Sequence, residues 1–200
     1  MTPDELHGGE YELVAVLTHD DIAHFAVQYF LHRHSWVTWL HHLMSLATIA
    51  AAVAAGWGSA GASFAQAGLG LLAMVIVILP LHEALHALAY RLCGARDIRW
   101  SYTLRTLVVY VTAHRFVVTT KPFLFVALAP FLLNVPLVIC ALVWPQYAVF
   151  FLAILVFHLH GESGDWAMLN FIWIHRDRGF WTWDDADAGK SYFYGRRSAL

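Results

Sequence analysis

Four stretches of the chain are apolar for long enough to cross a lipid bilayer. A transmembrane helix needs about 20 mostly apolar residues, so each stretch predicts one spanning helix. The connections near Gly56–Ser63 and Pro145–Gln146 are short and uncharged, which favours two turns at one membrane face. The stretches are Trp36–Trp57, Phe64–Cys93, Phe123–Trp144 and Tyr147–Ile174.

The composition agrees with a bilayer as the solvent of these helices. Of the 200 residues, 60% are apolar and 13% are charged, and the mean hydropathy is +0.57. Soluble domains have about 45–50% apolar and about 25% charged residues. The expected fold class is therefore mainly α and integral to a membrane. A formal net charge of −2 gives no indication of nucleic-acid binding.

The basic residues indicate how the four helices are oriented. All 12 Lys and Arg lie outside the two short turns. The positive-inside rule places the regions that hold them in the cytoplasm. We therefore expect a multi-pass protein of the cell membrane with both termini and the long middle connection on the cytoplasmic side. The basic residues are Arg33, Arg91, Arg96, Arg99, Arg105, Arg115, Lys121, Arg176, Arg178, Lys190, Arg196 and Arg197.

The regions outside the apolar stretches predict a short helix and a small sheet. Thr18 is the expected start of an interfacial helix with an acidic first turn, and residues 12–17 favour a short strand. Apolar and polar residues alternate over residues 98–105, which is the period of a half-buried strand. Residues 107–112 and 116–120 are rich in Val, Thr and aromatic residues, which favours strands. We expect a cytoplasmic β-hairpin or small sheet between the second and third helices.

The second apolar stretch contains the sequence His82-Glu83-Ala84-Leu85-His86. Residues four apart lie on one face of a helix, so both imidazoles can reach one metal ion. Zinc accepts imidazole nitrogen at about 2.0–2.1 Å. Glu83 would lie near such an ion without binding it, where it can move a proton from water to a leaving amine. The alternative is a pair of helix-face histidines beside an unrelated acid.

The position of this motif favours the metal-binding interpretation. It follows the apolar run Leu71–Leu79. An unpaired carboxylate at membrane depth is energetically costly and rare unless it faces a cavity or a partner. Pro80 removes one helix hydrogen bond just before the motif, and Gly94 suits the end of the helix. We therefore expect Glu83 to face a metal or a cavity.

A catalytic zinc ion usually takes three protein ligands, so a third must come from elsewhere in the chain. The fourth stretch holds four candidates. Asp165 lies 18 residues into its stretch, as His82 does in the second, which is about 27 Å at 1.5 Å per residue. This equal depth favours Asp165. Because the ends of the stretches are defined only to within a few residues, the others stay open, with helix packing or a hydrogen bond to a ligand as their alternative roles: His158, His160 and Glu162.

Asn134 is a polar residue in the third stretch, between Pro130 and Pro136. Its amide could position a substrate carbonyl or stabilise a tetrahedral intermediate. The alternative is a hydrogen bond between helices, worth about 0.6 kcal/mol on average. The balance slightly favours the hydrogen bond. The two prolines are expected to kink this helix.

Taken together, these residues resemble a membrane family of zincin peptidases. The resemblance rests on the motif at 82–86, the residues 87–95 that follow it, a strand-like stretch, and Ser163-Gly164-Asp165 in a later helix. It covers residues 64–175. That family is in turn similar to the site-2 proteases, which are intramembrane metalloproteases.

The resemblance implies roles for particular residues. His82, His86 and Asp165 would be the zinc ligands, and Glu83 would be the catalytic acid and base. Gly164 precedes the aspartate and Trp166 follows it, which fits the smaller family better than the site-2 proteases.

The leading hypothesis is hydrolysis of a peptide bond near the cytoplasmic membrane face, with Zn²⁺ as cofactor. The expected partners are a peptide or membrane-protein substrate and the lipid bilayer. One alternative is a zinc-binding membrane protein without catalysis (a degenerate peptidase, a sensor or a carrier), and another is a membrane scaffold or chaperone with an incidental motif. Residues 1–35 would be a cytoplasmic or interfacial segment, residues 36–175 the membrane-embedded metallopeptidase core, and residues 176–200 a cytoplasmic tail.

Overall fold

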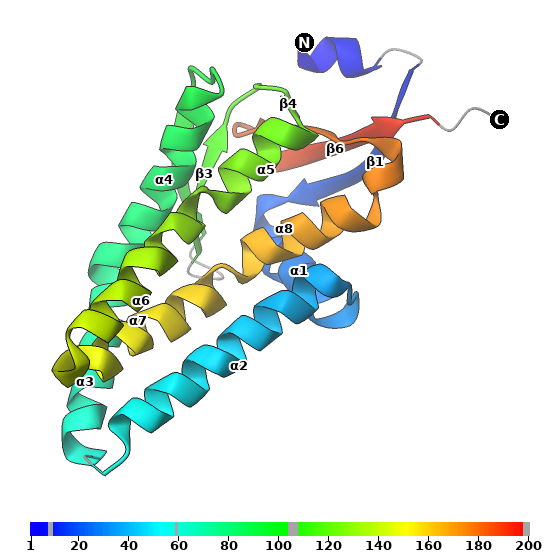
Figure 1. Cartoon of the computed structure of the whole chain (residues 1–200). Helices are drawn as coiled ribbons and strands as arrows, with labels where there is room; N and C mark the ends of the chain where they lie inside the picture. The colour runs from blue at the N-terminus through cyan, green and yellow to red at the C-terminus, as the bar shows by residue number, and fades with distance from the viewer. Residues whose placement is uncertain (8–9, 59, 104–107, 198–200) are drawn as a thin grey trace.

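Long apolar helices and two small antiparallel sheets make up the structure, which is a computed structural model of the chain (Figure 1). Within the part of the chain that the structure describes, three helical segments are long and apolar enough to cross a bilayer: Trp36–Gly56, Ala60–Leu92 and Thr120–Val143. The pair Pro145–Gly161 and Ser163–Ile174, bent by 46°, makes a fourth if the pair counts as one span. The structure describes residues 1–7, 10–58, 60–103 and 108–197.

The first two apolar stretches are helical nearly to their predicted ends. Helix α2 (Trp36–Gly56) is capped by a Ser35 side chain that accepts the Val37 N–H at 3.1 Å. Helices α3 (Ala60–Ala73) and α4 (Leu79–Leu92) are joined by the π-helical turn Met74–Ile78. This turn lies just before Pro80, which has no N–H to continue the regular hydrogen bonds. Gly94, with φ of +101°, follows the end of α4 as expected.

The third stretch contains the expected break. Helix α5 (Thr120–Leu128) and helix α6 (Asn134–Val143) are separated by the 3-10 segment Ala129–Leu133. Pro130 lies within this segment, and its missing N–H prevents a regular α-helical hydrogen bond there. The break sets the position of Asn134, which is the first residue of α6.

Helix α7 (Ala148–Gly161) lies among three other long helices, because it packs against α2, α3 and α6. Gly70 permits the close approach of α3, since a Cβ at that position would lie 2.8 Å from the Phe150 carbonyl oxygen. The chain then bends by 46° into helix α8 (Ser163–Ile174). Helix α8 packs against α1 (Ile22–Ala26), α2 and α5. The bend therefore moves the residues after Glu162 out of the α7 environment.

The four-stranded sheet joins segments from both ends of the chain. Its order is β1-β6-β5-β4, and each neighbouring pair is antiparallel. The strand expected near residues 12–17 is confirmed as β1. The strands are β1 (Tyr11–Thr18), β6 (Lys190–Arg196), β5 (Trp181–Asp185) and β4 (Val118–Thr119).

The hairpin expected between the second and third helices is confirmed. Strand β2 (Ile98–Thr103) pairs antiparallel with β3 (Val108–Ala113). The end of the predicted alternation, residues 104–105, and the first residue of the next predicted strand, residue 107, lie outside the described residues. Strands β5 and β6 were not expected from the sequence. Trp181 and Trp183 alternate with Thr182 in β5, β6 contains the aromatic run Tyr192–Tyr194, and Gly189 (φ +62°) lies in the turn between the strands, so a hairpin signal was present.

The interfacial helix expected after Thr18 is helical through residues 19–32. It packs on the protein as well, because Phe25 is buried with its ring centroid 5.6 Å from that of Phe171 in α8 and 6.4 Å from that of Phe193 in β6. The turns α2–α3 and α6–α7 lie at one end of the molecule, and the sheets and both termini lie at the other (Figure 1). This arrangement agrees with the expectation that the two short turns lie at one face, opposite the termini and the middle connection.

Candidate metal centre

Helix α4 brings the two motif histidines to one side of the same helical turn. His82 and His86 are four residues apart, and their ring centroids are separated by 4.8 Å. Their Nε2 atoms are separated by 3.2 Å. The two side chains are only 7% and 11% exposed. Two imidazole nitrogens therefore converge where little water can solvate them.

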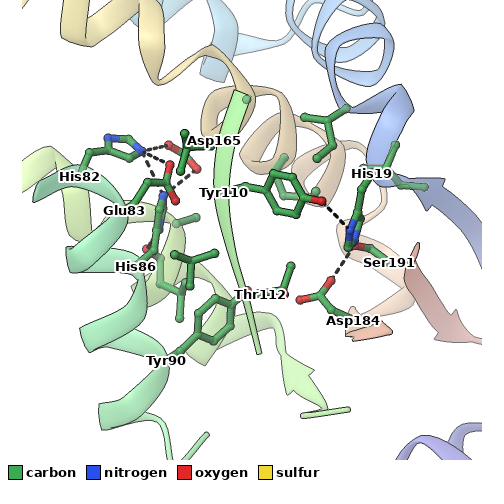
Figure 2. A pocket seen from close by; sticks show the side chains of 18 of the residues that line it. His19, His82, Glu83, His86, Tyr90, Tyr110, Thr112, Asp165, Asp184 and Ser191 are labelled. Atoms are coloured by element: carbon green, nitrogen blue, oxygen red, sulfur yellow. Dashed lines mark hydrogen bonds and ion pairs between the residues drawn. The ribbon is translucent and has the colours of Figure 1, made fainter. Parts of the chain in front are cut away.

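Asp165 reaches the same point from helix α8 (Figure 2). It lies in the first turn of α8, directly after the bend. Its Oδ2 is 3.3 Å from His82 Nε2, and its Oδ1 is 3.3 Å from His86 Nε2. The residue favoured as third ligand is thus in contact with both imidazoles. We call His82, His86 and Asp165 the ligand triangle.

The dimensions of the ligand triangle fit a tetrahedral zinc ion. With metal–ligand bonds of about 2.0 Å, the corners of a tetrahedron lie about 3.3 Å apart. The measured separations are 3.2, 3.3 and 3.3 Å. Imidazole and carboxylate groups are also the ligand types of catalytic zinc sites, which leave a fourth position open for water. The side chains present therefore suit zinc in both chemistry and spacing.

A hydrogen bond on the far side of each histidine fixes the nitrogen that faces the triangle. His86 Nδ1 lies 3.0 Å from the Val126 carbonyl oxygen. A carbonyl only accepts, so Nδ1 carries the proton and Nε2 keeps its lone pair. His82 Nδ1 lies 3.1 Å from His158 Nε2. Such hydrogen bonds usually orient metal-ligating histidines.

A row of buried polar groups continues outward from His82. His158 Nδ1 lies 2.7 Å from Asn134 Oδ1, and Asn134 Nδ2 donates to Glu162 Oε1 at 3.1 Å. The amide oxygen is an acceptor, so His158 donates from Nδ1 and accepts the His82 N–H at Nε2. His158 and Glu162 are 0% exposed and Asn134 is 9% exposed. We call His158, Asn134 and Glu162 the buried relay.

The oxygen and the nitrogen of the Asn134 amide both form hydrogen bonds with side chains of other segments. This geometry corresponds to the interhelical hydrogen bond that was the alternative to substrate positioning. Asn134 begins α6, whereas its partners His158 and Glu162 lie in α7 and at its end. The amide orientation that satisfies both partners points the oxygen to His158 and the nitrogen to Glu162.

The other candidates for the third ligand take different places. His160 is exposed, and its Nδ1 lies 2.7 Å from the Val156 carbonyl oxygen. His158 and Glu162 form a second group with His82, whose ligand atoms lie within 4.8 Å of one another. The cavity beside the ligand triangle is lined by Asp165 and His86 but by neither His158 nor Glu162. The ligand triangle is therefore the group that a substrate can reach.

Glu83 lies beside the ligand triangle without being part of it. Its Oε1 is 3.9 Å from His82 Nε2, and its side chain is 8% exposed. The backbone N–H of Val111 in strand β3 is directed at this carboxylate. Glu83 is thus held at the edge of the cavity, next to the ligand triangle.

A cavity of about 360 Å³ separates these groups from a second set of polar side chains. One wall carries Glu83 and the ligand triangle, and the facing wall carries residues from the helix after β1 and from strands β3, β5 and β6 (Figure 2). The facing wall was not expected from the sequence, because no spacing along the chain links its members. We call this set the polar wall: His19, Tyr110, Thr112, Asp184 and Ser191.

Burial sets the protonation of the polar wall. Desolvation lowers the pKa of His19 below its ordinary value, which favours the neutral imidazole. Burial also raises the pKa of Asp184 to about 6, although the Ser191 hydroxyl donates to it and opposes the shift. At neutral pH, His19 is therefore neutral and Asp184 is mainly ionised.

Comparison with known proteins agrees with this geometry. A family model described as "Putative zincin peptidase" matches residues 75–178, which is half of the chain and contains Glu83, the ligand triangle and the buried relay. No curated protein and no solved structure matches the chain. Zincins are zinc peptidases, so the match points to metallopeptidase activity and to zinc in general. The chain therefore belongs to this zincin peptidase family.

Proposed function

We propose that the protein is a membrane-embedded zinc endopeptidase that cleaves peptide bonds near the cytoplasmic membrane face. The observation that carries this proposal is the ligand triangle, with sides of 3.2, 3.3 and 3.3 Å, on the wall of a cavity that also contains Glu83. Family membership supports the reaction class. In our proposal the chain is related to the site-2 proteases, because both would bind zinc through two motif histidines and an aspartate from a later helix.

Charge supports a divalent cation at this site. Asp165 and Glu83 bring two carboxylates into a nearly buried space, and the ion-pair partners described for them are the imidazoles of His82 and His86. Buried carboxylates are costly without a compensating positive charge. A Zn²⁺ ion between the three ligands would balance both acids while leaving the imidazoles neutral.

Each catalytic group has a defined task in this proposal. His82, His86 and Asp165 would hold the ion. A bound zinc ion supplies a Lewis acid that polarises the scissile carbonyl and makes water easier to deprotonate. Glu83 takes a proton from the attacking water and delivers it to the leaving amine. The buried relay keeps His82 in the tautomer that presents Nε2.

Strand β3 offers a surface for an extended substrate. Val109, Tyr110, Val111 and Thr112 line the cavity. Because the Val111 N–H is directed at Glu83, this edge of β3 is not the one that pairs with β2. A peptide that added along the same edge would run beside the catalytic carboxylate.

The proposed membrane arrangement has four spans and places both termini in the cytoplasm. The bent pair α7–α8 would be the fourth span, and the contacts of Asp165 with both motif histidines support an equal depth of the two helices at this point. Arg and Lys residues follow the ends of α4 and α8, as a cytoplasmic location of those ends requires. Water would then enter the site from the cytoplasmic side. Substrates in this arrangement are peptides or segments of membrane proteins.

Metal removal tests the peptidase proposal. Purified protein in detergent is expected to contain about one zinc ion per chain, since the triangle has three ligands for one ion. A chelator should abolish cleavage of a fluorogenic peptide library, and zinc should restore it where magnesium does not. Stoichiometric zinc without cleavage of any peptide would favour the non-catalytic zinc-binding alternative. Protein that takes up no zinc would refute both.

Replacing Asn134 by leucine tests the buried relay. The substitution keeps the side-chain size but removes the acceptor for His158 Nδ1–H. We expect zinc affinity to fall by about 10–100-fold, because the His82 tautomer loses its support. The measurement is a competition titration with a zinc indicator. Val135→Ala, an exposed position in the same helix, is the matched control. Unchanged affinity in the Asn134→Leu protein would contradict a role of the relay in zinc binding.

A further inference from the structure

The polar wall lies across the cavity from the ligand triangle, and catalysis as proposed above does not use it. Its members come from the helix after β1 (His19), from β3 (Tyr110, Thr112), from β5 (Asp184) and from β6 (Ser191). His19, Thr112 and Ser191 are buried, with 6%, 5% and 9% of their surface exposed. Polar groups in such a position either serve the fold alone or bind something in the cavity.

Hydrogen bonds in the polar wall run in one direction. The Ser191 hydroxyl donates to Asp184 Oδ1 at 2.6 Å, so its oxygen can only accept from His19 Nε2 at 3.3 Å. His19 therefore carries its proton on Nε2. Its Nδ1 then accepts the Tyr110 hydroxyl proton at 3.2 Å. Every proton in this row is directed toward Asp184.

This order excludes a serine-hydrolase arrangement. In such a triad the acid accepts a hydrogen bond from the histidine, and the serine hydroxyl donates to the other nitrogen of the histidine. Here the acid bonds to the serine, and the other nitrogen of His19 faces Tyr110. Ser191 is therefore not activated as a nucleophile.

Asp184 keeps an uncompensated negative charge. The donors described for its carboxylate are neutral, namely the Ser191 hydroxyl and the Ala113 N–H. His114 acts on this carboxylate electrostatically but pairs with Asp187, its Nε2 3.5 Å from Asp187 Oδ2. A carboxylate has about four acceptor positions, so capacity for further donors remains. The most favourable addition is a positively charged donor.

Thr112 provides an independent sign of a missing partner. Its side-chain oxygen is buried and has no hydrogen-bond partner among the described residues. Buried hydroxyls are usually satisfied, so this one calls for a ligand in the cavity that it lines. Thr112 and Asp184 both line the cavity, and the N–H of Ala113, the residue after Thr112, donates to the Asp184 carboxylate. One ligand group could therefore contact both.

We propose that Asp184 and Thr112 form a subsite that binds the ammonium or guanidinium group of a substrate lysine or arginine close to the scissile bond. This inference rests on the proposed peptidase function. The Ser191 hydroxyl donates to Asp184, and His19 and Tyr110 orient Ser191 through the same row of hydrogen bonds. The Asp184 carboxylate keeps acceptor positions for the incoming cation. The subsite makes the enzyme selective for a basic residue at one position of the substrate.

The cavity extends from the ligand triangle to Asp184, which suits a long basic side chain. Tyr90 follows His86 by four residues on α4, so it lies one helical turn, about 6 Å, further along the same face. Tyr90 and Asp184 both line the cavity. A lysine side chain has a flexible four-carbon stem and delivers its charge at a distance from the peptide backbone. Its ammonium group can reach the polar wall while the peptide bond stays at the ligand triangle.

The test uses matched peptides and the zinc-loaded full-length protein in detergent. A lysine is placed at each position around the scissile bond of a cleaved peptide and is compared with norleucine and with acetyl-lysine, which lack the charge. At one position, wild-type protein is expected to cleave the lysine peptide with a kcat/KM about 10–100-fold higher. Asp184→Asn should remove this preference while it retains cleavage of the norleucine peptide. Asp187→Asn, an exposed acid on the loop between β5 and β6, should keep the preference.

The outcomes separate this inference from the function on which it rests. Equal cleavage of the lysine and norleucine peptides at every position by wild-type protein would refute the subsite and leave the peptidase proposal intact. An equal loss of activity of Asp184→Asn protein on both peptides would show a purely structural role and would also refute it. No cleavage of any peptide by zinc-loaded wild-type protein would refute the peptidase proposal, and the subsite with it. The peptide comparison needs no variant, so poor folding of Asp184→Asn does not prevent the test.

Discussion

Replacement of Glu83 by glutamine is expected to abolish most peptide cleavage while zinc stays bound. The glutamine keeps the size of the side chain and its place beside the ligand triangle, but it cannot accept a proton from water. General acid–base catalysis contributes about 10²–10⁴-fold to the rate, so kcat should fall by this factor. Zinc binding should change little, because Glu83 Oε1 lies 3.9 Å from His82 Nε2 and is not one of the three ligand atoms.

Two measurements on the same preparation distinguish a loss of catalysis from a loss of zinc. Zinc content by atomic absorption should remain near the wild-type value, and cleavage of a fluorogenic peptide should be lost. Asp177→Asn, which removes an acid that is 86% exposed, is the matched control and should behave as wild type. Cleavage by the Glu83→Gln protein at the wild-type rate would end the assignment of Glu83 as the catalytic base.

Replacement of Asp165 by alanine is expected to release the metal. The carboxylate contacts both imidazoles at 3.3 Å and is the member of the triangle that α8 contributes. Loss of a supporting hydrogen bond around a zinc site already costs about 10–100-fold in affinity, so loss of a ligand should cost at least about 100-fold. The measurement is a zinc titration of the purified protein, together with its cleavage activity.

The matching variant for Asp165→Ala is Glu162→Gln, because Glu162 belongs to the other group of possible ligands around His82. If the ligand triangle is the zinc site, Glu162→Gln protein should bind zinc more tightly than Asp165→Ala protein. The reverse order of affinities would move the metal to His82, His158 and Glu162. That result would overturn our assignment of the third ligand.

Local sequence determined the helices and the position of the two motif histidines. An apolar run of about 20 residues satisfies its backbone hydrogen bonds as a helix, whatever surrounds it. Within such a run, the spacing of His82 and His86 alone puts both rings on one face. The position of Glu83 beside the two rings follows from the same helix. None of these predictions needed information on which helices are neighbours, and the ranges of α2 and α4 agree with the apolar stretches.

The contact of Asp165 with both motif histidines was favoured by the sequence but not decided by it. Equal depth in the two apolar stretches favoured Asp165, yet depth alone does not state which way a side chain faces. The 46° bend after Gly161 changes the direction of the helix between His158 and Asp165. As a result, His158 supports His82 from behind while Asp165 lies next to both imidazoles. A bend of this kind depends on packing between helices, which a single-chain pattern does not contain.

The polar wall was decided by tertiary structure alone. His19 and Ser191 are 172 residues apart, and they meet because β1 pairs with β6 and β6 pairs with β5. The sequence determined the apolar helices, the placing of His82 and His86 on one helix face and a hairpin after α4, because each depends on periodicity within a short segment. The facing side of the cavity, the bend before Asp165 and the partners of Asn134 depend on contacts between distant segments. Strand pairing and helix packing determine those contacts. Such contacts produce no periodic pattern in the sequence, so they could not be predicted from it.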